Sequence, residues 1–354
     1  MGRQSARLYF QGKDHKDIYF NGHYHDAMYL TDSEGNATLV WEKLKDIPIE
    51  DNVFKFAIIP NGRYAVALKG NIHIDWGDGE STDFERDSQL VITHTYNSVK
   101  RYIVQITGDL KNIKFTGGFY NVKDALVEIL SAFPKTMEKE TDFSDLLGGS
   151  AKIEQIPKDL LANCLSAQNF SAAFRGCTGL KSIPAGLFDN CHAATNFQNV
   201  FASTAITQIP QGLFKNCTNA ETFYNAFSDC AGITQIPQDL FWGQKKATNF
   251  SHVFYSCKNL ENLPQGLFKD CVNAYTFERA FMSCDKLEHV PENLFDNCNF
   301  VNNFGYTFYY CKSITSNVPE LWITHSGVNE HKYCYWHCEK AANYSSIPMN
   351  WIAY

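Results

Sequence analysis

A phrase of fixed length recurs along the second half of this chain. CTGLKSIPAGLFDNC begins at Cys177, and related phrases begin at Cys230, Cys257 and Cys284. Their anchoring prolines are spaced by 27, 26, 27, 27, 27 and 28 residues, at Pro157, Pro184, Pro210, Pro237, Pro264, Pro291 and Pro319. A constant period over seven copies is the signature of a solenoid, in which each repeat packs against its neighbours. We therefore expect residues 151–354 to form a solenoid with a C-terminal cap.

Apolar side chains keep the same places in most copies. In the copy anchored at Pro184, Phe170, Phe174 and Cys177 precede the proline by 14, 10 and 7 residues. This spacing places three apolar groups on one face of a short helix, and the proline marks a turn out of that helix. The residues just before the proline are expected to form a short strand. The prediction for the repeats is therefore an α/β solenoid of the leucine-rich-repeat type.

The first 150 residues have a different pattern and predict three further regions. Residues 51–118 contain short β-prone runs at regular spacing, FKFAII, YAVALKG, NIHIDW, LVITHTY and RYIVQITG, which predict an immunoglobulin-like β-sandwich. Residues 1–50 predict short β-hairpins with Gly and Asn turns. Residues 119–150 predict a helical connector, because Val122, Leu126, Ile129 and Leu130 have helical spacing.

Two stretches resemble known families. IDWGDGEST at residues 74–82, THTY at 93–96 and the following RYIVQITGD together resemble the PKD-type immunoglobulin-like domain. The longer unit F...F..C..L..IP..LF..C resembles the BspA-like leucine-rich repeats of bacterial surface proteins, in which a PKD-like segment can precede the repeats. The resemblance covers about residues 71–354. It implies a surface-exposed recognition protein in which the PKD-like domain is a spacer or binding module.

The twelve cysteines fall almost entirely in two columns of the repeat. One column is Cys164, Cys191, Cys217, Gln244, Cys271 and Cys298, and the other is Cys177, Ser203 or Thr204, Cys230, Cys257, Cys284, Cys311 and Cys338. Stacked neighbours could lie close enough for disulfides. However, Gln244 and Ser203/Thr204 replace cysteine singly, whereas an obligatory pair should lose both partners. We therefore favour buried free cysteine as a small apolar filler, with disulfides or a metal as alternatives.

Three groups of side chains have the chemistry of metal ligands. They are His15, His23 and His25; Asp75 and Asp78; and His331, Cys334, His337 and Cys338. The three N-terminal histidines also fit exposed alternate positions of a hairpin. The aspartates could bind calcium, but in a tight turn they are expected to cap their own backbone. The last group could bind zinc, but Cys338 continues the repeat and its neighbours are expected to form an aromatic end cap.

No motif of an enzyme is present in the sequence. GxSxG, HExxH and a glycine-rich phosphate loop are all absent. Cys191 and His192 could form a nucleophile pair, but this cysteine belongs to a core column. We predict no enzyme, no cofactor and no catalytic residue. The net charge of −7 argues against a nucleic-acid partner. The sequence contains no run of 18 apolar residues, so it predicts no membrane span. The first thirty residues lack an apolar signal core, so a removed signal and another export route both stay open.

Variable positions between the core columns suggest a function. QNFSAAF, TNFQNVF, ETFYNAF, TNFSHVF and YTFERAF differ in Gln, Ser, Tyr, His and Arg, which fits a recognition face or ordinary solvation. The leading prediction is a non-enzymatic recognition or adhesion protein, surface-exposed or extracellular, whose solenoid binds a protein or carbohydrate. The alternative is a structural or receptor-binding component of a phage or prophage particle, suggested by IYFNG…LVWEKL and the missing signal. The ligand, the bound face and the oligomeric state stay open.

Overall fold

The computed structural model describes residues 52–115 and 122–353, together with the backbone of four short strands before them. These strands are β1 (Leu8–Phe10), β2 (Lys13–His15), β3 (Tyr29–Thr31) and β4 (Ala37–Leu39). β1 pairs with β2 and β3 pairs with β4, both antiparallel. The hairpins belong to a compact unit, Met1–Asp51, and the rest of the chain, Asn52–Tyr354, forms a second unit.

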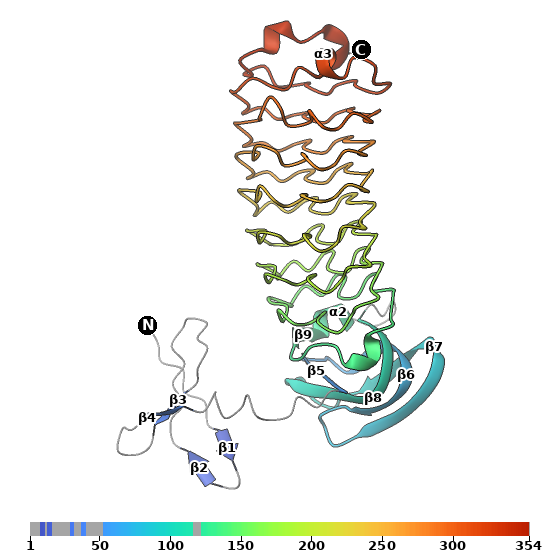
Figure 1. Ribbon diagram of the computed structural model, residues 1–354. Coiled ribbons are helices and arrows are strands. Elements are labelled where there is room, and N and C mark those ends of the chain that lie inside the picture. The colour runs from blue at the N-terminus through green and yellow to red at the C-terminus, as the bar shows by residue number, and fades with distance from the viewer. Residues whose placement is uncertain are drawn as a thin grey trace. The chain divides into compact units, whose positions relative to one another are not determined.

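The second unit begins with a five-stranded antiparallel sheet (Figure 1). Its strands are β5 (Val53–Ile58), β6 (Arg63–Asp75), β7 (Ser81–Thr95), β8 (Tyr102–Lys114) and β9 (Leu126–Ile129), in the order β7-β6-β8-β5-β9. Alternation of buried and exposed side chains along β8 gives the sheet one buried face. The segment predicted as a helical connector has one helical turn, α2 (Val122–Ala125), before it becomes strand β9, and a 3-10 turn at η1 (Lys135–Met137).

The prediction of a two-sheet sandwich for residues 51–118 is wrong. These residues contribute to a single sheet, and the layer against its buried face comes from the chain that follows. Phe54 of β5 stacks on Phe133 with ring centroids 4.8 Å apart, Phe133 lies 5.9 Å from Phe143, and Phe143 lies 5.6 Å from Phe170. Alternating strands predict a buried face, but they do not specify which layer covers it. One apolar core therefore runs from the sheet into the repeats.

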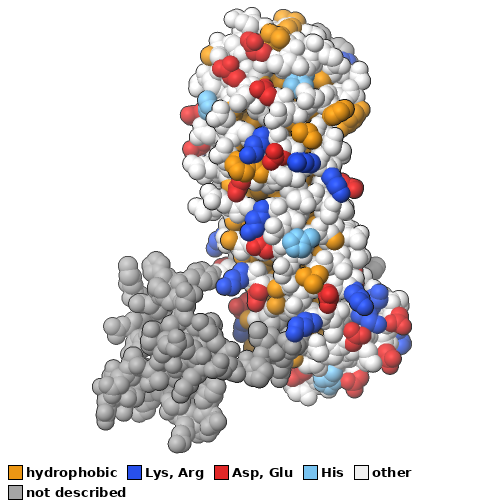
Figure 2. Space-filling model, viewed as in Figure 1, with side chains coloured by type: hydrophobic (Ala, Val, Ile, Leu, Met, Phe, Trp, Pro, Cys, Tyr) orange, Lys and Arg blue, Asp and Glu red, His pale blue; other side chains and the backbone are white. Residues whose placement is uncertain are grey.

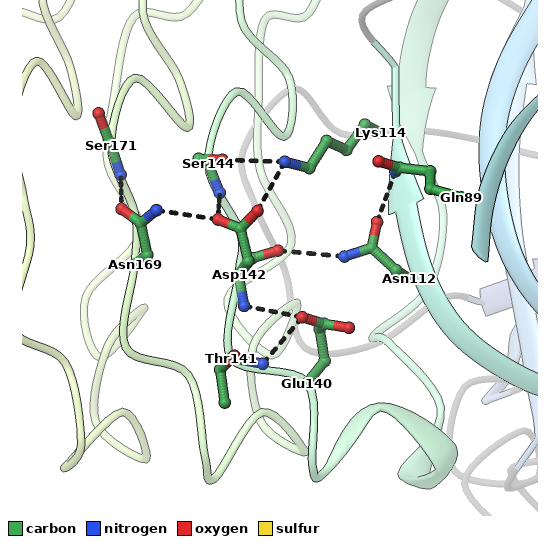
Figure 3. Close-up of polar contacts among 9 residues, drawn as sticks. All are labelled: Gln89, Asn112, Lys114, Glu140, Thr141, Asp142, Ser144, Asn169 and Ser171. Atoms are coloured by element: carbon green, nitrogen blue, oxygen red, sulfur yellow. Dashed lines mark hydrogen bonds and ion pairs between the residues drawn. The ribbon is translucent and has the colours of Figure 1, made fainter. Parts of the chain in front are cut away.

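Polar contacts join the same two parts (Figure 3). Lys114, the last residue of β8, donates from Nζ to Asp142 Oδ2 at 2.8 Å and to Ser144 Oγ at 2.9 Å. The amide of Asn112 donates to the carbonyl oxygen of Asp142 at 3.1 Å. Asn169, one repeat later, donates from Nδ2 to Asp142 Oδ1 at 2.9 Å. Asp142 thus connects β8 to the second repeat.

From residue 141 to residue 338 the chain winds into a stack of coils (Figure 1), which we call the coil stack. Corresponding residues of neighbouring coils pair through isolated parallel bridges, in the series Asp142, Asn169, Asn196, Thr222, Asn249, Thr276, Asn303 and Glu330. The prediction of α/β repeats is wrong, since the coils consist of turns and bridges. After η1, the helices of the described chain are single turns near its end, α3 (Leu321–Thr324), η2 (Tyr344–Ser346) and α4 (Met349–Ile352).

Consecutive four-residue turns take the place of the expected helix in each repeat. In one coil, Ala173 N donates to Phe170 O and Cys177 N to Phe174 O. The N–H groups of Phe170 and Phe174 instead donate to carbonyl oxygens of the next coil. Ala172 has φ 57°, a left-handed conformation that interrupts a right-handed helix. Because consecutive turns begin four residues apart, at Phe170 and Phe174, both rings lie on the buried side, and the apolar spacing could not distinguish these turns from a helix.

Three columns of stacked phenylalanine rings form the core of the coil stack. In the first column neighbouring centroids are 5.3–5.9 Å apart, a distance typical of aromatic pairs. The columns are Phe143, Phe170, Phe197, Phe223, Phe250, Phe277 and Phe304; Phe174, Phe201, Phe227, Phe254, Phe281 and Phe308; and Phe188, Phe214, Phe241, Phe268 and Phe295. Every one of these rings is buried, so each coil depends on its neighbours for its core.

The twelve cysteines are all free and buried. Many thiols have a hydrogen-bonding role in addition to filling space. Cys257 donates from Sγ to Phe227 O at 3.2 Å, and Cys284 donates to Phe254 O at 3.3 Å. Each of these carbonyls lies 30 residues earlier, on a preceding coil. The cysteine columns therefore supply donors to buried backbone oxygens between coils.

Candidate ligand-binding face

The WGDG turn and the HTY segment form one structural cluster. Asp75 Oδ1 accepts from Gly77 N at 2.9 Å, and Asp78 Oδ1 accepts from Glu80 N at 3.1 Å. Asp78 Oδ2 lies 2.7 Å from His94 Nε2, and the His94 ring stacks on Trp76 at 4.8 Å. Burial would raise the pKa of Asp78, but its hydrogen bonds to His94 and to the Glu80 N–H lower it. The carboxylates are thus engaged in the turn itself.

The four potential zinc ligands near the C-terminus, His331, Cys334, His337 and Cys338, do not come together at one point. Cys338 donates from Sγ to Phe308 O at 3.1 Å, while the ring of His331 stacks on Trp351 at 4.5 Å. His337 Nδ1 lies 3.2 Å from Glu339 Oε1. Within residues 52–115 and 122–353, no three His, Cys, Asp or Glu side chains are placed to share a metal ion. The side chains of His15, His23 and His25 lie outside the described residues.

The residues considered as a nucleophile pair, Cys191 and His192, do not form one. Cys191 is buried in the core, and burial raises the pKa of its thiol to about 12. His192 is exposed, and its Nδ1 faces the carbonyl oxygen of Asn216 at 3.3 Å. The thiol is therefore protonated at neutral pH and directed away from solvent.

Two positions of each coil have a left-handed backbone, which sequence reasoning did not predict. In the first, φ lies between 51° and 60°; we call it the left-handed column, and it comprises Asp145, Ala172, Asn199, Asn225, His252, Arg279, Tyr306 and Tyr333. The second comprises Gly149, Gly176, Ser203, Asp229, Ser256, Ser283, Tyr310 and His337. Both columns carry small or short polar residues in the early coils and large rings in the last two. Bulky residues are uncommon in this backbone region.

The last two coils place six rings side by side, and we call this cluster the aromatic face. Its members are Tyr306, Tyr309, Tyr310, Tyr333, Trp336 and His337, all partly exposed. Tyr306 and Tyr333, at equivalent positions of consecutive coils, stack at 5.2 Å with an interplanar angle of 24°. Tyr309 is nearly perpendicular to Tyr333 at 84°, and Trp336 is nearly perpendicular to it at 85°.

A cavity of about 500 Å³ opens among these rings. It is lined by Tyr306, Tyr309, Tyr333, Trp336 and Ala353. This volume falls within the range of roughly 300–1,000 Å³ that is typical of small-molecule sites. The lining combines apolar ring faces with phenol and indole groups that can form hydrogen bonds. The cavity can therefore hold a compact ligand that is apolar on one side and polar at its edge.

Charges surround the aromatic face without lining its cavity. Arg279 places its guanidinium carbon 4.8 Å from the centre of the Tyr306 ring and pairs with Glu278 at 2.6 Å. Lys312 lies over Tyr310 at 4.5 Å. Burial and the neighbouring phenols of Tyr310, Tyr306 and Tyr333 raise the pKa of Tyr309. Tyr309 therefore stays a neutral hydrogen-bonding group at physiological pH.

On the face drawn in Figure 2, the charged side chains of the coil stack do not form a large patch of one sign. Figure 2 shows acidic and basic side chains interspersed along the coil stack. A nucleic-acid interface would need a basic stripe, and this face does not present one. In the part of the chain that the structure describes, no helix has the length and apolarity needed to span a bilayer.

Sequence reasoning selected the variable positions but missed the rings of the last coils. Tyr224, His252 and Arg279 lie in the predicted variable segments and are partly exposed. Tyr306 lies outside those segments, and Trp336 lies in HKYCYWHC, for which the sequence predicts an aromatic end cap. Aligning GYTFYYC with HKYCYWHC at the 27-residue period could have shown that large rings replace small residues of earlier coils.

No protein-family model matches this chain, and no curated protein sequence matches it.

Proposed function

We propose that this chain is a non-enzymatic recognition protein whose partner binds the C-terminal half of the coil stack. The observation that carries this proposal is the change along the left-handed column from Asn199 and Asn225 to Arg279, Tyr306 and Tyr333. A left-handed backbone costs an ordinary L-residue roughly 1–2 kcal/mol, and Asn tolerates it better. Bulky residues kept in such conformations are characteristic of functional sites.

The chemistry of the aromatic face supports the same proposal. Tyr, Trp and Arg are the side chains that most often contribute large binding energies at interfaces. Here Tyr306, Tyr309, Tyr333 and Trp336 are partly exposed, next to Arg279. The core rings lie behind them in separate columns, so the face can contact a partner without disturbing the fold.

The proposed partner is a protein or carbohydrate on a cell surface or in a matrix. The resemblance of the repeats to those of bacterial surface proteins supports a surface-exposed or extracellular location. The PKD-like WGDG and HTY segments support a spacer role for the sheet, since their polar side chains are engaged in internal hydrogen bonds.

The test is binding of the labelled full-length protein to intact bacteria, immobilised matrix proteins and a glycan panel. A triple variant replaces Arg279, Tyr306 and Tyr333 by Asn, the residue that the same column holds at Asn199 and Asn225. Asn is already accommodated in this backbone conformation, so the variant is expected to fold. We expect saturable binding by the wild type and a loss of about tenfold or more in the variant.

The matched control is Phe300→Asn, which removes an aromatic ring that is 66% exposed and lies outside the aromatic face. The equivalent position of the preceding coil is Asn273. Wild-type binding by this control is expected. Saturable binding that the triple variant retains in full would move the site elsewhere, and an absence of saturable binding to every target would end the recognition proposal.

A further inference from the structure

The cavity of the aromatic face has features that specify a ligand class, which deepens the proposed function and rests on it. We propose that this cavity binds a neutral sugar ring of a glycan, held among Tyr306, Tyr309, Tyr333 and Trp336. These four side chains and Ala353 line a space of about 500 Å³. This volume lies within the range of roughly 300–1,000 Å³ that is typical of small-molecule sites, which favours a compact ligand.

The aromatic lining suits the apolar surface of a pyranose. The face of an aromatic ring is electronegative, whereas the axial C–H groups of a sugar form an apolar and weakly electropositive surface. Tyr306 and Tyr333 lie 5.2 Å apart and within 24° of parallel, so these two rings stack on each other along consecutive coils. Trp336 stands at 85° to Tyr333, and Tyr309 at 84° to it. The perpendicular rings bound the space beside the parallel pair.

Hydrogen-bonding groups are available at this site for the hydroxyls of a sugar. Among residues 52–115 and 122–353, the hydroxyls of Tyr306 and Tyr309 and the indole N–H of Trp336 have no protein partner. A buried sugar hydroxyl needs such partners, because an unpaired polar group loses its hydration without compensation. The site therefore offers both an apolar surface and polar atoms.

The charge pattern favours a neutral ligand over a cation or a phosphate. None of the five lining residues is charged. Arg279, on Tyr306, is already paired with Glu278 at 2.6 Å. A cationic ligand would meet Arg279 and Lys312, which already lie over Tyr306 and Tyr310, and like charges repel. A phosphate is usually bound by free Arg or Lys, and no such side chain lines this cavity.

The test uses full-length protein and neutral trisaccharides of different linkage: maltotriose, cellotriose and triacetylchitotriose. Saturation-transfer NMR reports which sugar protons touch the protein, and calorimetry gives the affinity. We expect saturable binding of at least one trisaccharide, with the strongest transfer at axial C–H protons. Trp336→Ser introduces the residue that Ser228 supplies at the equivalent position four coils earlier, and it is expected to weaken this binding at least about tenfold. Phe300→Asn is expected to bind as the wild type does.

The outcomes separate this inference from the proposed function. Binding of none of the three trisaccharides at millimolar concentration would overturn the sugar proposal, as would full binding by Trp336→Ser. If the triple Asn variant still lost binding to cells or matrix proteins in that case, recognition by the face would stand with a protein ligand instead. If the triple variant kept cell and matrix binding as well, both proposals would fail.

Discussion

The side-chain amide of Gln244 donates to the carbonyl oxygen of Phe214 at 2.9 Å. On the neighbouring coils the same role belongs to thiols, since Cys217 and Cys271 each direct Sγ to the corresponding carbonyl at 3.7 Å. A buried carbonyl left without a donor costs about 1–3 kcal/mol. The requirement at this column is therefore a donor of suitable size, and cysteine meets it in most coils.

Substitution of Gln244 tests whether the column needs a donor or only volume. Gln244→Cys is expected to change the free energy of unfolding by less than about 1 kcal/mol, because its effects oppose one another. The smaller thiol leaves a small cavity, which is destabilising. However, the thiol supplies the same donor as in the neighbouring coils, and the substitution removes the unpaired Oε1 of Gln244. Gln244→Leu keeps the volume and removes the donor, so it should cost about 1–3 kcal/mol. Chemical denaturation under reducing conditions measures both. Equal stability of the two variants would show that the column requires only volume.

The left-handed backbone predicts where glycine stabilises this protein. Ser256 has φ 58° and lies in the second left-handed position of its coil. Ser256→Gly should raise the free energy of unfolding by roughly 0.5–1 kcal/mol, because relief of the strain exceeds the greater flexibility of the unfolded chain. The exposed Lys258 lacks a positive φ, so Lys258→Gly should be neutral or destabilising. Thermal unfolding of the two variants compares them, and destabilisation by Ser256→Gly would contradict the strain account.

The stability of the junction between the sheet and the coil stack is expected to fall at acidic pH. Burial would raise the pKa of Asp142, but hydrogen bonds from Lys114 and Ser144 lower it. Its stabilising contribution is therefore present above the unfolded pKa of about 3.9 and is lost as pH falls through the lower folded pKa. Asp142→Asn should cost no more than about 1 kcal/mol at pH 7, because the carboxylate is 44% exposed and water screens its pairing with Lys114. Its cost should disappear in strong acid, where the wild type is also protonated.

An exposed ion pair on the coil stack provides the control for this measurement. Lys181 and Glu154 are 3.8 Å apart, with side chains 69% and 67% exposed. Lys181→Ala should change the free energy of unfolding by no more than about 0.5 kcal/mol at either pH, because exposed pairs are screened. Denaturation curves at neutral and acidic pH give both numbers. A cost for Asp142→Asn that did not change with pH would assign its role to packing.

The buried thiols predict a loss of stability in alkali. Burial raises the pKa to about 11 for Cys230 and to about 12 for Cys191 and Cys298. In the unfolded chain a thiol titrates near about 8.5. Above that pH the folded chain holds more protons than the unfolded chain, so stability falls as pH rises toward the folded pKa. Each thiol contributes about 1.4 kcal/mol per pH unit to this fall.

Denaturation between pH 7 and pH 10 measures this slope. Cys230→Thr is the matched variant, because Thr204 holds the same column position on the preceding coil and makes a hydrogen bond to Phe201 O at 2.8 Å. It should reduce the slope by the contribution of one thiol while the protein stays folded at pH 7. Stability that was constant between pH 8 and pH 10 would contradict the raised thiol pKa values.

The sequence period predicts which side chains are buried much better than it predicts the backbone conformation of these residues. Phe170, Phe174 and Cys177 were assigned to one apolar side, and all three are buried. Their spacing also fits a helix, and only the hydrogen bonds to the next coil and the left-handed Ala172 distinguish the turns that form. Similarly, the β-prone runs predict the strands of the sheet, but contact between Phe54 and Phe133 decides which layer covers them.

The candidate site could be predicted from the sequence only by comparing equivalent positions of different coils. Tyr306 and Trp336 are ordinary aromatic residues in the linear sequence. They stand out only by comparison with equivalent residues of earlier coils: Asn199 and Asn225 correspond to Tyr306, and Ser228 corresponds to Trp336. A composition argument detects neither the strained backbone nor the right angles between the rings.

The sheet covers one end of the coil stack and the C-terminal residues cover the other, and this limits how copies of the protein can associate. An open coil would present backbone groups and ring faces onto which another chain could add. At the first coil, Phe115 N donates to Leu146 O, and Phe54 leads through Phe133 into the first ring column. At the last coil, Tyr335 N donates to Trp351 O. Because the described chain covers both ends of the coil stack, end-to-end growth of the stack into filaments is opposed.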